Sequence, residues 1–348
     1  MKYLLIDGNN LACRASFGNP DLRSSNGIPT GVHFGFFNSL INLKQQYPDY
    51  QFLISWDGKS KRRVSEAKAG VEKGLIKSGY KENRDKEALP QPLKDFFAQA
   101  PFLKQAVDQT GIPQIRLPDF ETDDVIASYC KTLEKDNEVV VVTGDEDYMQ
   151  LLSDKVSIWD GKKQKHITKD TWTKETGITP DQFVHVGALM GDTGDNIFGV
   201  YGVGYETALD LIKEHGTWEN VYVAFHKEVD SLRVQYPDLK NNPDEFKRLE
   251  EIKTKSGKQK YVGVTVDLPF TGVALALEDK KIKGLSKTTI MTLMFEERVR
   301  LAYSLKKMDV IENLPEIKQG QYNGDRLQEY LDYYEMQSIK DTIDILKG

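Results

Sequence analysis

Three short apolar runs, each followed by an aspartate, constrain what this chain folds into. The runs cover residues 2–6, 51–55 and 138–143, and the aspartates that follow them are Asp7, Asp57 and Asp145. Continuous apolar runs of this length are typical of parallel strands buried on both faces. A single aspartate after a strand is usually a turn or cap residue. Three at equivalent strand ends indicate a shared site, because the carboxyl ends of parallel strands meet at one edge of a sheet.

Helical periodicity separates these strands along the chain. It predicts helices at residues 32–43, 92–108, 122–134, 180–190, 297–307 and 326–346. Strands that alternate with helices predict an α/β fold with a doubly wound, mainly parallel sheet. Such sheets bind ligands at the carboxyl ends of their strands. Residues 217–296 carry mixed signals, and no element is predicted there.

Further acidic side chains extend the set to nine carboxylates. Glu121, Asp123 and Asp124 stand together in FETDD, Asp147 follows Asp145 in GDEDY, and GDTGD supplies Asp192 and Asp195. Many carboxylates in one site repel one another and hold protons unless a cation compensates them. Oxygen-rich sites suit Mg²⁺, for which Mn²⁺ can substitute. Two such ions ~3.5–4 Å apart stabilise both the attacking and the leaving oxygen of an in-line phosphoryl displacement.

The distribution of charge agrees with a polyanionic partner, although the net charge of the chain is −6. Without the nine carboxylates, the remainder of the chain is mildly basic, as phosphate binding requires. Residues 58–86 contain ten basic and four acidic side chains, a net charge of +6. Such a run is usually a solvated helix face. Here Tyr80 stands beside Lys81 and close to Arg84, a combination that favours contact with single-stranded nucleic acid.

A glycine-rich segment, GVYGVG at residues 199–204, runs into a helical pattern soon after Asp195. Turns of this kind leave backbone N–H groups free near a helix N-terminus, where an anion or phosphate binds. Alone the pattern is weak, and a plain helix–turn–helix is the alternative. Its position directly after the acidic cluster favours the phosphate-binding interpretation.

The composition also argues against several classes of protein. Two cysteines outside any CxxC pair and five scattered histidines argue against a zinc site and indicate a reducing, cytoplasmic setting. No apolar stretch approaches the ~18–20 residues that cross a bilayer. The N-terminus has a short apolar run without a signal-peptide cleavage site. We therefore expect no membrane contact.

Seven motifs between residues 4 and 212 resemble those of the 5′ nuclease family, which contains flap endonucleases and 5′–3′ exonucleases. They are LLIDGNNLACRASF, TGVHFGFFNSL, SWDGKSKRR, GYKENRD, FETDD, VVTGDEDYMQLL and GDTGDNIFGVYGVGYETALDLI, in the family's order. Within that family the chain looks similar to phage 5′ exonucleases and to the N-terminal nuclease domain of bacterial DNA polymerase I. A weaker likeness follows in residues 300–310 and 327–339.

The resemblance implies a role for each matching residue. It implies a first metal site of Asp7, Asp57, Glu121 and Asp123 with Asp124 close by, and a second of Asp145, Asp147 and Asp192 with Asp195 nearby. Lys81 matches the family's catalytic lysine in a helical arch, and Arg84 matches its phosphate-contacting arginine. The glycine-rich turn matches a helix–hairpin–helix that grips duplex DNA, often with a bound potassium ion. The expected DNA-binding residues are Tyr80, Arg62, Arg63, Gly199, Val200, Gly202, Val203 and Gly204.

The same comparison predicts two regions. Residues 1–186 form a nuclease core with the arch at about 58–90, and residues 187–348 form a helix–hairpin–helix DNA-binding region with C-terminal helices. Two departures from the family are extra residues around 66–77 and a longer insertion at about 222–292. No polymerase-like segment follows, so we expect a free-standing, monomeric nuclease.

The expected activity is metal-dependent hydrolysis of DNA phosphodiester bonds, by 5′–3′ exonuclease action, flap cleavage or both, in replication or repair. The expected substrates are 5′ flaps, nicked or duplex ends, and RNA primers in hybrid with DNA. A PIN-like ribonuclease uses a similar strand-end cluster but is shorter and lacks the GDTGDN–GVYGVG segment. A non-catalytic binder is disfavoured because every carboxylate of the family pattern is intact. The sequence does not choose between exonuclease and flap preference.

Overall fold

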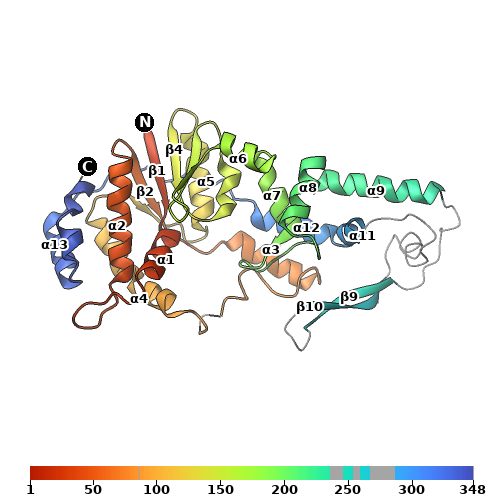
Figure 1. Ribbon diagram of the computed structural model, residues 1–348, viewed down its shortest axis with the longest axis horizontal. Coiled ribbons are helices and arrows are strands. Elements are labelled where there is room, and N and C mark those ends of the chain that lie inside the picture. The colour runs from red at the N-terminus through yellow and green to blue at the C-terminus, as the bar shows by residue number, and fades with distance from the viewer. Residues whose placement is uncertain (86, 236–245, 254–258, 267–286, 348) are drawn as a thin grey trace.

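A six-stranded sheet lies in the left half of the computed structural model in Figure 1, which describes residues 1–348 except 86, 236–245, 254–258, 267–286 and 348. The strand order is β3-β2-β1-β4-β5-β6. The strands are β1 (Lys2–Asp7), β2 (Gln51–Ser55), β3 (Gln114–Ile115), β4 (Glu138–Val142), β5 (Val156–Asp160) and β6 (Lys165–Ile167). Neighbouring strands are parallel except β5 and β6, which are antiparallel. The predicted mainly parallel α/β sheet is confirmed.

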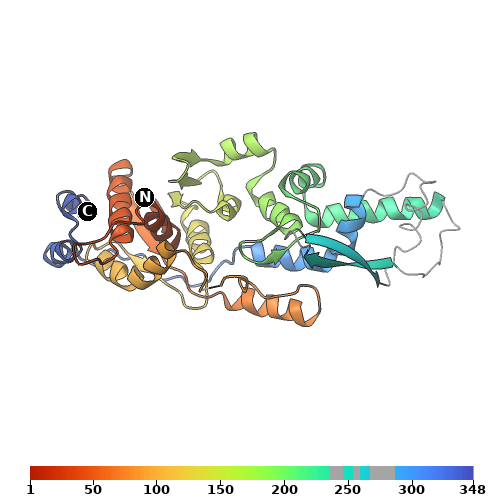
Figure 2. The same cartoon turned by 60° about the horizontal axis from the view of Figure 1, so that its bottom comes forward.

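Helices cover both faces of the sheet and continue well beyond it (Figure 2). In chain order they are α1 (Gly8–Gly18), α2 (Gly31–Gln46), α3 (Lys61–Glu72), α4 (Gln91–Asp108), α5 (Thr122–Leu133), α6 (Lys169–Thr176), α7 (Phe183–Met190), α8 (Tyr205–His215), α9 (Trp218–Gln235), α11 (Lys287–Met294), α12 (Glu296–Lys306), α13 (Gly324–Tyr333) and α14 (Gln337–Lys340). Short 3₁₀ helices are η1 (Glu146–Leu151), η2 (Pro180–Gln182) and η4 (Ile343–Leu346). Within the described ranges, no helix is long and apolar enough to cross a membrane.

Alternate residues of the central strands enter two hydrophobic cores, one on each face of the sheet. Leu5, Leu53 and Val141 are neighbours across β2, β1 and β4, and all three belong to the core that includes α5. Leu4 and Ile6 belong to the opposite core, which packs against α1, α2 and α4. Burial on both faces explains why these strands read as continuous apolar runs.

Most sequence-based element predictions are confirmed. The predicted strands correspond to β1, β2 and β4, and the helices predicted at 32–43, 92–108, 122–134 and 297–307 correspond to α2, α4, α5 and α12. The segment 180–190 divides into η2 and α7. The single helix predicted at 326–346 is wrong, because α13, α14 and η4 occupy this segment. Glu335 follows α13 with a left-handed φ of +54°, through which a right-handed helix cannot continue.

The region beyond the sheet is built from helices around a small hairpin. β7 (Gly191–Asp192) and β8 (Ile197–Phe198) pair antiparallel between α7 and α8. α9 extends away from the sheet, so the molecule is elongated (Figure 1). Within the insertion predicted at about 222–292, the described residues form the end of α9, the start of α11 and an antiparallel pair, β9 (Phe246–Lys253) with β10 (Gln259–Val266). The remainder of that insertion lies outside the described residues.

Candidate active site

The three strand-end aspartates lie at the carboxyl ends of three neighbouring parallel strands, as predicted. Asp7 ends β1 and caps α1, where its Oδ1 accepts a hydrogen bond from Asn10 N at 2.9 Å. Asp57 follows β2, and its Oδ1 accepts from Thr122 N at 3.0 Å. Asp145 follows β4 and caps η1. Each aspartate therefore acts locally as a cap, and the sheet brings all three to one edge.

Several carboxylates at this edge hold protons more strongly than free ones. Burial, and then the charge of Asp57, raise the pKa of Asp7 to about 8, while Tyr148 Oη donates to Asp7 Oδ2 at 3.1 Å. Burial also raises the pKa of Asp145 and brings that of Asp147 to about 7. Shifts of this kind mark carboxylates that lack a sufficient counter-charge.

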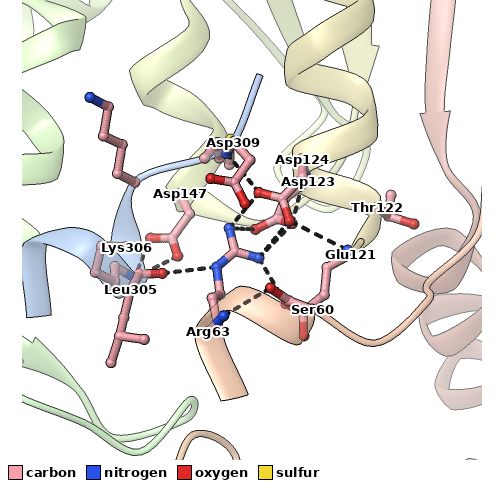
Figure 3. Close-up of polar contacts among 12 residues, drawn as sticks. Ser60, Arg63, Glu121, Thr122, Asp123, Asp124, Asp147, Leu305, Lys306 and Asp309 are labelled. Carbon is pink, nitrogen blue, oxygen red and sulfur yellow. Dashed lines mark hydrogen bonds and ion pairs between the residues drawn. The ribbon is translucent and has the colours of Figure 1, made fainter. Parts of the chain in front are cut away.

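Arg63 of α3 lies among the FETDD carboxylates (Figure 3). Its Nη2 is 2.8 Å from Asp124 Oδ1, and its Nη1 is 3.1 Å from Asp123 Oδ1 and 3.2 Å from Glu121 Oε2. The side chain is 1% exposed, and its Nε donates to Leu305 O. The predicted DNA-binding role of Arg63 is therefore corrected, because the buried guanidinium is used entirely inside the protein.

Arg62, the other arginine of this pair, is also occupied by protein groups. Its Nε lies 2.7 Å from Asp309 Oδ1, and its Nη1 and Nη2 donate to the carbonyl oxygens of Ser304 and Lys307. These contacts join α3 to the C-terminal end of α12. The predicted contact of Arg62 with DNA is corrected in the same way, since its donors already serve this junction.

Asp124, predicted to lie close to the first metal site, has both of its carboxylate oxygens occupied by protein groups. It is fully buried, and both of its oxygens accept hydrogen bonds from Arg63. Asp309 N also donates to its Oδ1, at 2.8 Å. Burial and the charge of Asp123 raise its pKa to about 7. Asp124 therefore ties α5 to α3 and to the segment after α12.

The second half of the acidic set is held by Lys306, which the sequence analysis missed. Its Nζ lies 2.5 Å from both oxygens of Asp147 and 2.9 Å from Asp192 Oδ2. Burial alone would raise the pKa of Asp192, but Lys306 outweighs burial and lowers it. The adjacent Lys307 is exposed, and nothing in the local sequence distinguishes the two lysines.

Lys81 and Arg84 reach the same carboxylate edge from the segment after α3. Lys81 Nζ lies 2.7 Å from Glu121 Oε2, and Arg84 Nη2 lies 2.6 Å from Asp195 Oδ1. The backbone N–H of Lys81 donates to Asp195 O, and Lys81 adopts a left-handed φ of +57°. Such a conformation costs on the order of 1 kcal/mol for a residue with a Cβ and is common at functional sites.

Tyr80 does not offer the stacking surface that the sequence suggested. It is 8% exposed, and its hydroxyl donates to Glu121 Oε2 at 2.9 Å and Asp195 Oδ2 at 3.0 Å. Its expected contact with a DNA base is corrected, because the ring is part of the core. Tyr80 instead positions the carboxylates that Lys81 and Arg84 contact.

The glycine-rich turn leads into α8, whose first residue follows Gly204. Gly204 is the N-cap of α8 and provides no side-chain cap to its N-terminal N–H groups. A Cβ added at Gly202 or Gly204 would meet no atom within 4 Å, whereas one at Gly199 would lie 2.4 Å from Gly191 N. Val200 and Val203 are buried in the core. The open positions on this turn are therefore Gly202 and Gly204, and the valines anchor it.

The donor set fits divalent metal ions in its chemistry. All nine side chains are hard oxygen ligands of the kind that Mg²⁺ and Mn²⁺ prefer. Within the described residues, no three acidic, histidine or cysteine side chains form a group that could hold an ion in this arrangement. Arg63, Lys81 and Lys306 hold several of the oxygens. Metal binding therefore requires these basic groups to release some of them.

A mainly parallel α/β sheet with carboxylates at its strand ends and basic side chains beside them suits a nuclease, an enzyme that hydrolyses phosphodiester bonds. Residues 2–177 match the 5′-3′ exonuclease N-terminal resolvase-like domain, and residues 178–262 match the 5′-3′ exonuclease C-terminal SAM fold. The chain belongs to the 5′–3′ exonuclease family and is a 5′–3′ exonuclease acting on DNA.

Relatives of known name agree with this assignment. The chain is 32% identical over 286 residues to the 5′-3′ exonuclease of Aquifex aeolicus, covering 81% of this chain and 88% of that protein. It is 35% identical over 234 residues to the thermostable DNA polymerase I of Thermus thermophilus, covering 67% of this chain. The match spans only 26% of that polymerase. The activities of the whole polymerase are therefore not transferred to this chain.

Solved structures support the fold. The phage T5 5′-exonuclease, described with bound divalent metal ions (zinc), aligns with a TM-score of 0.57 at 17% identity, covering 99% of this chain and all of that one. The catalytic core of Rad2 in complex with a DNA substrate aligns with a TM-score of 0.56 at 14% identity, covering 100% and 93%. At these identities the likeness concerns the fold alone.

Proposed function

We propose that this nuclease uses two Mg²⁺ ions, replaceable by Mn²⁺, to cut DNA at 5′ flaps, nicks and duplex ends. The first ion would be held by Asp7, Asp57, Glu121 and Asp123, and the second by Asp145, Asp147, Asp192 and Asp195. When bound, the ions supply Lewis-acid stabilisation of the scissile phosphate and an activated water. Asp124 is left out of the ligand set because Arg63 and Asp309 N occupy its oxygens.

Lys81 and Arg84 are proposed to bind the scissile phosphate. Both belong to the arch segment at about 58–90, and both now pair with carboxylates at the sheet edge. A phosphate placed at this edge would offer them new oxygens when Glu121 and Asp195 turn to a metal. The two cations would then neutralise charge that develops on the phosphate, and the product would carry a 5′-phosphate.

The duplex part of the substrate is proposed to bind at the turn of residues 199–204. The uncapped N-terminus of α8 and the open glycine positions suit a phosphate of the DNA backbone. A potassium ion at the carbonyl groups of this turn would add to the grip.

We place the boundary between the nuclease core and this DNA-binding region at residues 186 and 187. We also propose that the protein is a monomer, that it acts in replication or repair, and that it also cuts RNA primers in hybrid with DNA.

The single observation that carries the proposal is the convergence of Asp7, Asp57 and Asp145 at one sheet edge beside Lys81. The test compares a 5′-labelled flap, a nicked duplex and a blunt duplex, each with Mg²⁺ or with EDTA. Asp123→Asn should abolish cleavage, and Asp119→Asn is the control because Asp119 lies at the surface, where it pairs with the exposed Lys61. Cleavage that persists in EDTA, or normal turnover by Asp123→Asn, would exclude the metal mechanism.

A further inference from the structure

We propose that Lys306 is a built-in counter-ion that occupies the place between Asp147 and Asp192 where a second metal ion would bind. Its Nζ contacts both oxygens of Asp147 and one of Asp192. Mg²⁺ binds carboxylate oxygens at ~2.0–2.1 Å and tolerates little departure from octahedral geometry. An ammonium and a metal ion cannot occupy the same position between these two carboxylates. A metal that binds here must displace Lys306.

Lys306 is fixed in this place by the surrounding structure. Lys306 is only 5% exposed. Its aliphatic side chain packs over Gly187 of α7, where an added Cβ would lie 3.1 Å from Lys306 Cε. Gln150 Nε2 donates to its carbonyl oxygen. The preceding residue, Leu305, accepts a hydrogen bond from the buried Arg63. The ammonium is therefore positioned by α12 and is not a surface charge that drifts into the site.

The two halves of the carboxylate set differ in this respect. Among the described residues, no basic side chain pairs with the carboxylate of Asp7 or Asp57, which accept hydrogen bonds from backbone N–H groups and, at Asp7, from the Tyr148 hydroxyl. In the half around Asp7, Arg63 and Lys81 pair with Asp123 and Glu121 and not with the two strand-end aspartates. In the other half, Lys306 lies directly between Asp147 and Asp192. A divalent ion should therefore bind first and more tightly beside Asp7. The second ion should bind more weakly, because it must also break the contacts of Lys306.

This inference rests on the proposed metal function, and the experiment separates the two. Mn²⁺ is titrated into the metal-free full chain without DNA, and bound ions are counted from the electron paramagnetic resonance signal of free Mn²⁺. Wild type should bind one ion tightly and a second at least tenfold more weakly. Lys306→Gln should tighten the second event at least tenfold. Lys306→Arg, which keeps the charge, and Lys307→Gln, at the exposed neighbour, should both resemble wild type.

Melting temperatures provide a second readout for a variant that is less stable. Lys306→Gln leaves two partly buried carboxylates uncompensated, so it should melt lower than wild type without metal and gain more from added Mn²⁺. Three outcomes would overturn the role of Lys306 but not the proposed metal function. They are equal numbers and affinities of bound ions in wild type and Lys306→Gln, an equal rise in melting temperature on adding Mn²⁺, or loss of the second ion in Lys306→Gln. Absence of Mn²⁺ binding in every variant would overturn the proposed metal function as well.

Discussion

Arg63 Nη2 lies 2.8 Å from Asp124 Oδ1, and both side chains are almost fully buried. Breaking a buried ion pair leaves an uncompensated charge and costs about 3–5 kcal/mol. Asp124→Asn should therefore lower the free energy of unfolding by roughly that amount, measured by urea denaturation. Asp123→Asn is the matched comparison, because Asp123 is partly exposed. It should cost little stability yet abolish cleavage while retaining or improving DNA binding. Equal stability losses in the two variants would contradict the division of roles.

Lys81 is expected to act on the reaction more than on the fold. Lys81→Met removes the cation that lies 2.7 Å from Glu121 Oε2. If that cation moves to the scissile phosphate, its loss should lower kcat by roughly 10²–10³-fold, as for other groups that stabilise transition-state charge. Single-turnover cleavage of a labelled flap measures the effect, with Lys77→Met in the same segment as control. A change in KM alone would show that Lys81 binds substrate without assisting the chemistry.

The metal-free protein should lose stability as the pH rises from 6.5 to 8.5. The pKa values of Asp7 and Asp147, about 8 and about 7, lie above the unfolded value of 3.8. In this window the folded state therefore binds more protons than the unfolded state, and its stability falls with pH. The fall should be on the order of 2 kcal/mol. His33, whose pKa is lowered to about 4, is already neutral in both states over most of this range.

Saturating Mg²⁺ should remove or reverse this pH dependence, because a bound metal favours the ionised carboxylates. Urea denaturation in EDTA and in Mg²⁺ at both pH values provides the measurement, and Asp7→Asn should reduce the slope in EDTA. A metal-free protein that becomes more stable toward pH 8.5 would contradict the assignment of these shifts.

The glycine turn offers a way to separate DNA binding from folding. Gly204 has an extended φ of −92°, and a Cβ there meets nothing within 4 Å. Gly204→Val should fold normally and bind metal normally, yet weaken duplex binding at least tenfold by holding the phosphate away from α8. Gly18→Val, at another open position, is the control for the substitution itself. Unchanged DNA affinity, or a change confined to metal affinity, would exclude the phosphate grip.

The arch segment is expected to receive the 5′ strand by threading. Its start is joined to α12 through Arg62, and its later part returns to the sheet edge, where Lys81 N donates to Asp195 O. A chain segment fixed at both ends can enclose a strand, so a free 5′ end would have to pass through it. A biotinylated 5′ flap capped with streptavidin before mixing should be cut much more slowly than one capped after binding. Equal rates in the two orders would indicate a clamp that closes over the strand.

Local sequence patterns were sufficient for β1, β2 and β4 and for the acidic edge of the sheet, whereas β3, β5 and β6 were not predicted. The strands that end at Asp7, Asp57 and Asp145 are short apolar runs, and parallel pairing alone brings their ends together. The break in residues 326–346 was not predictable in this way. Glu335 ends α13 with a left-handed backbone, although no glycine or proline interrupts the helical pattern there.

The basic residues show where sequence reasoning fails. Arg62, Arg63 and Tyr80 stand in a run that reads as a DNA-binding surface, yet all three are engaged with protein groups. Charge and aromatic content identify residues that are able to meet nucleic acid. They do not say whether the side chain faces solvent, because that depends on which distant segment packs against the helix.

The sequence by itself determined three neighbouring strands, the family of the chain and the carboxylates at the sheet edge, because each depends on patterns within a few neighbouring residues. Only the tertiary structure decided which cation neutralises which carboxylate. Arg63 meets Leu305 across 242 positions of the chain, and Lys306 meets Asp147 across 159. Such pairs form when α3 and α12 pack beside the sheet and exclude water. Electrostatic pairing over that sequence distance leaves no local pattern to read.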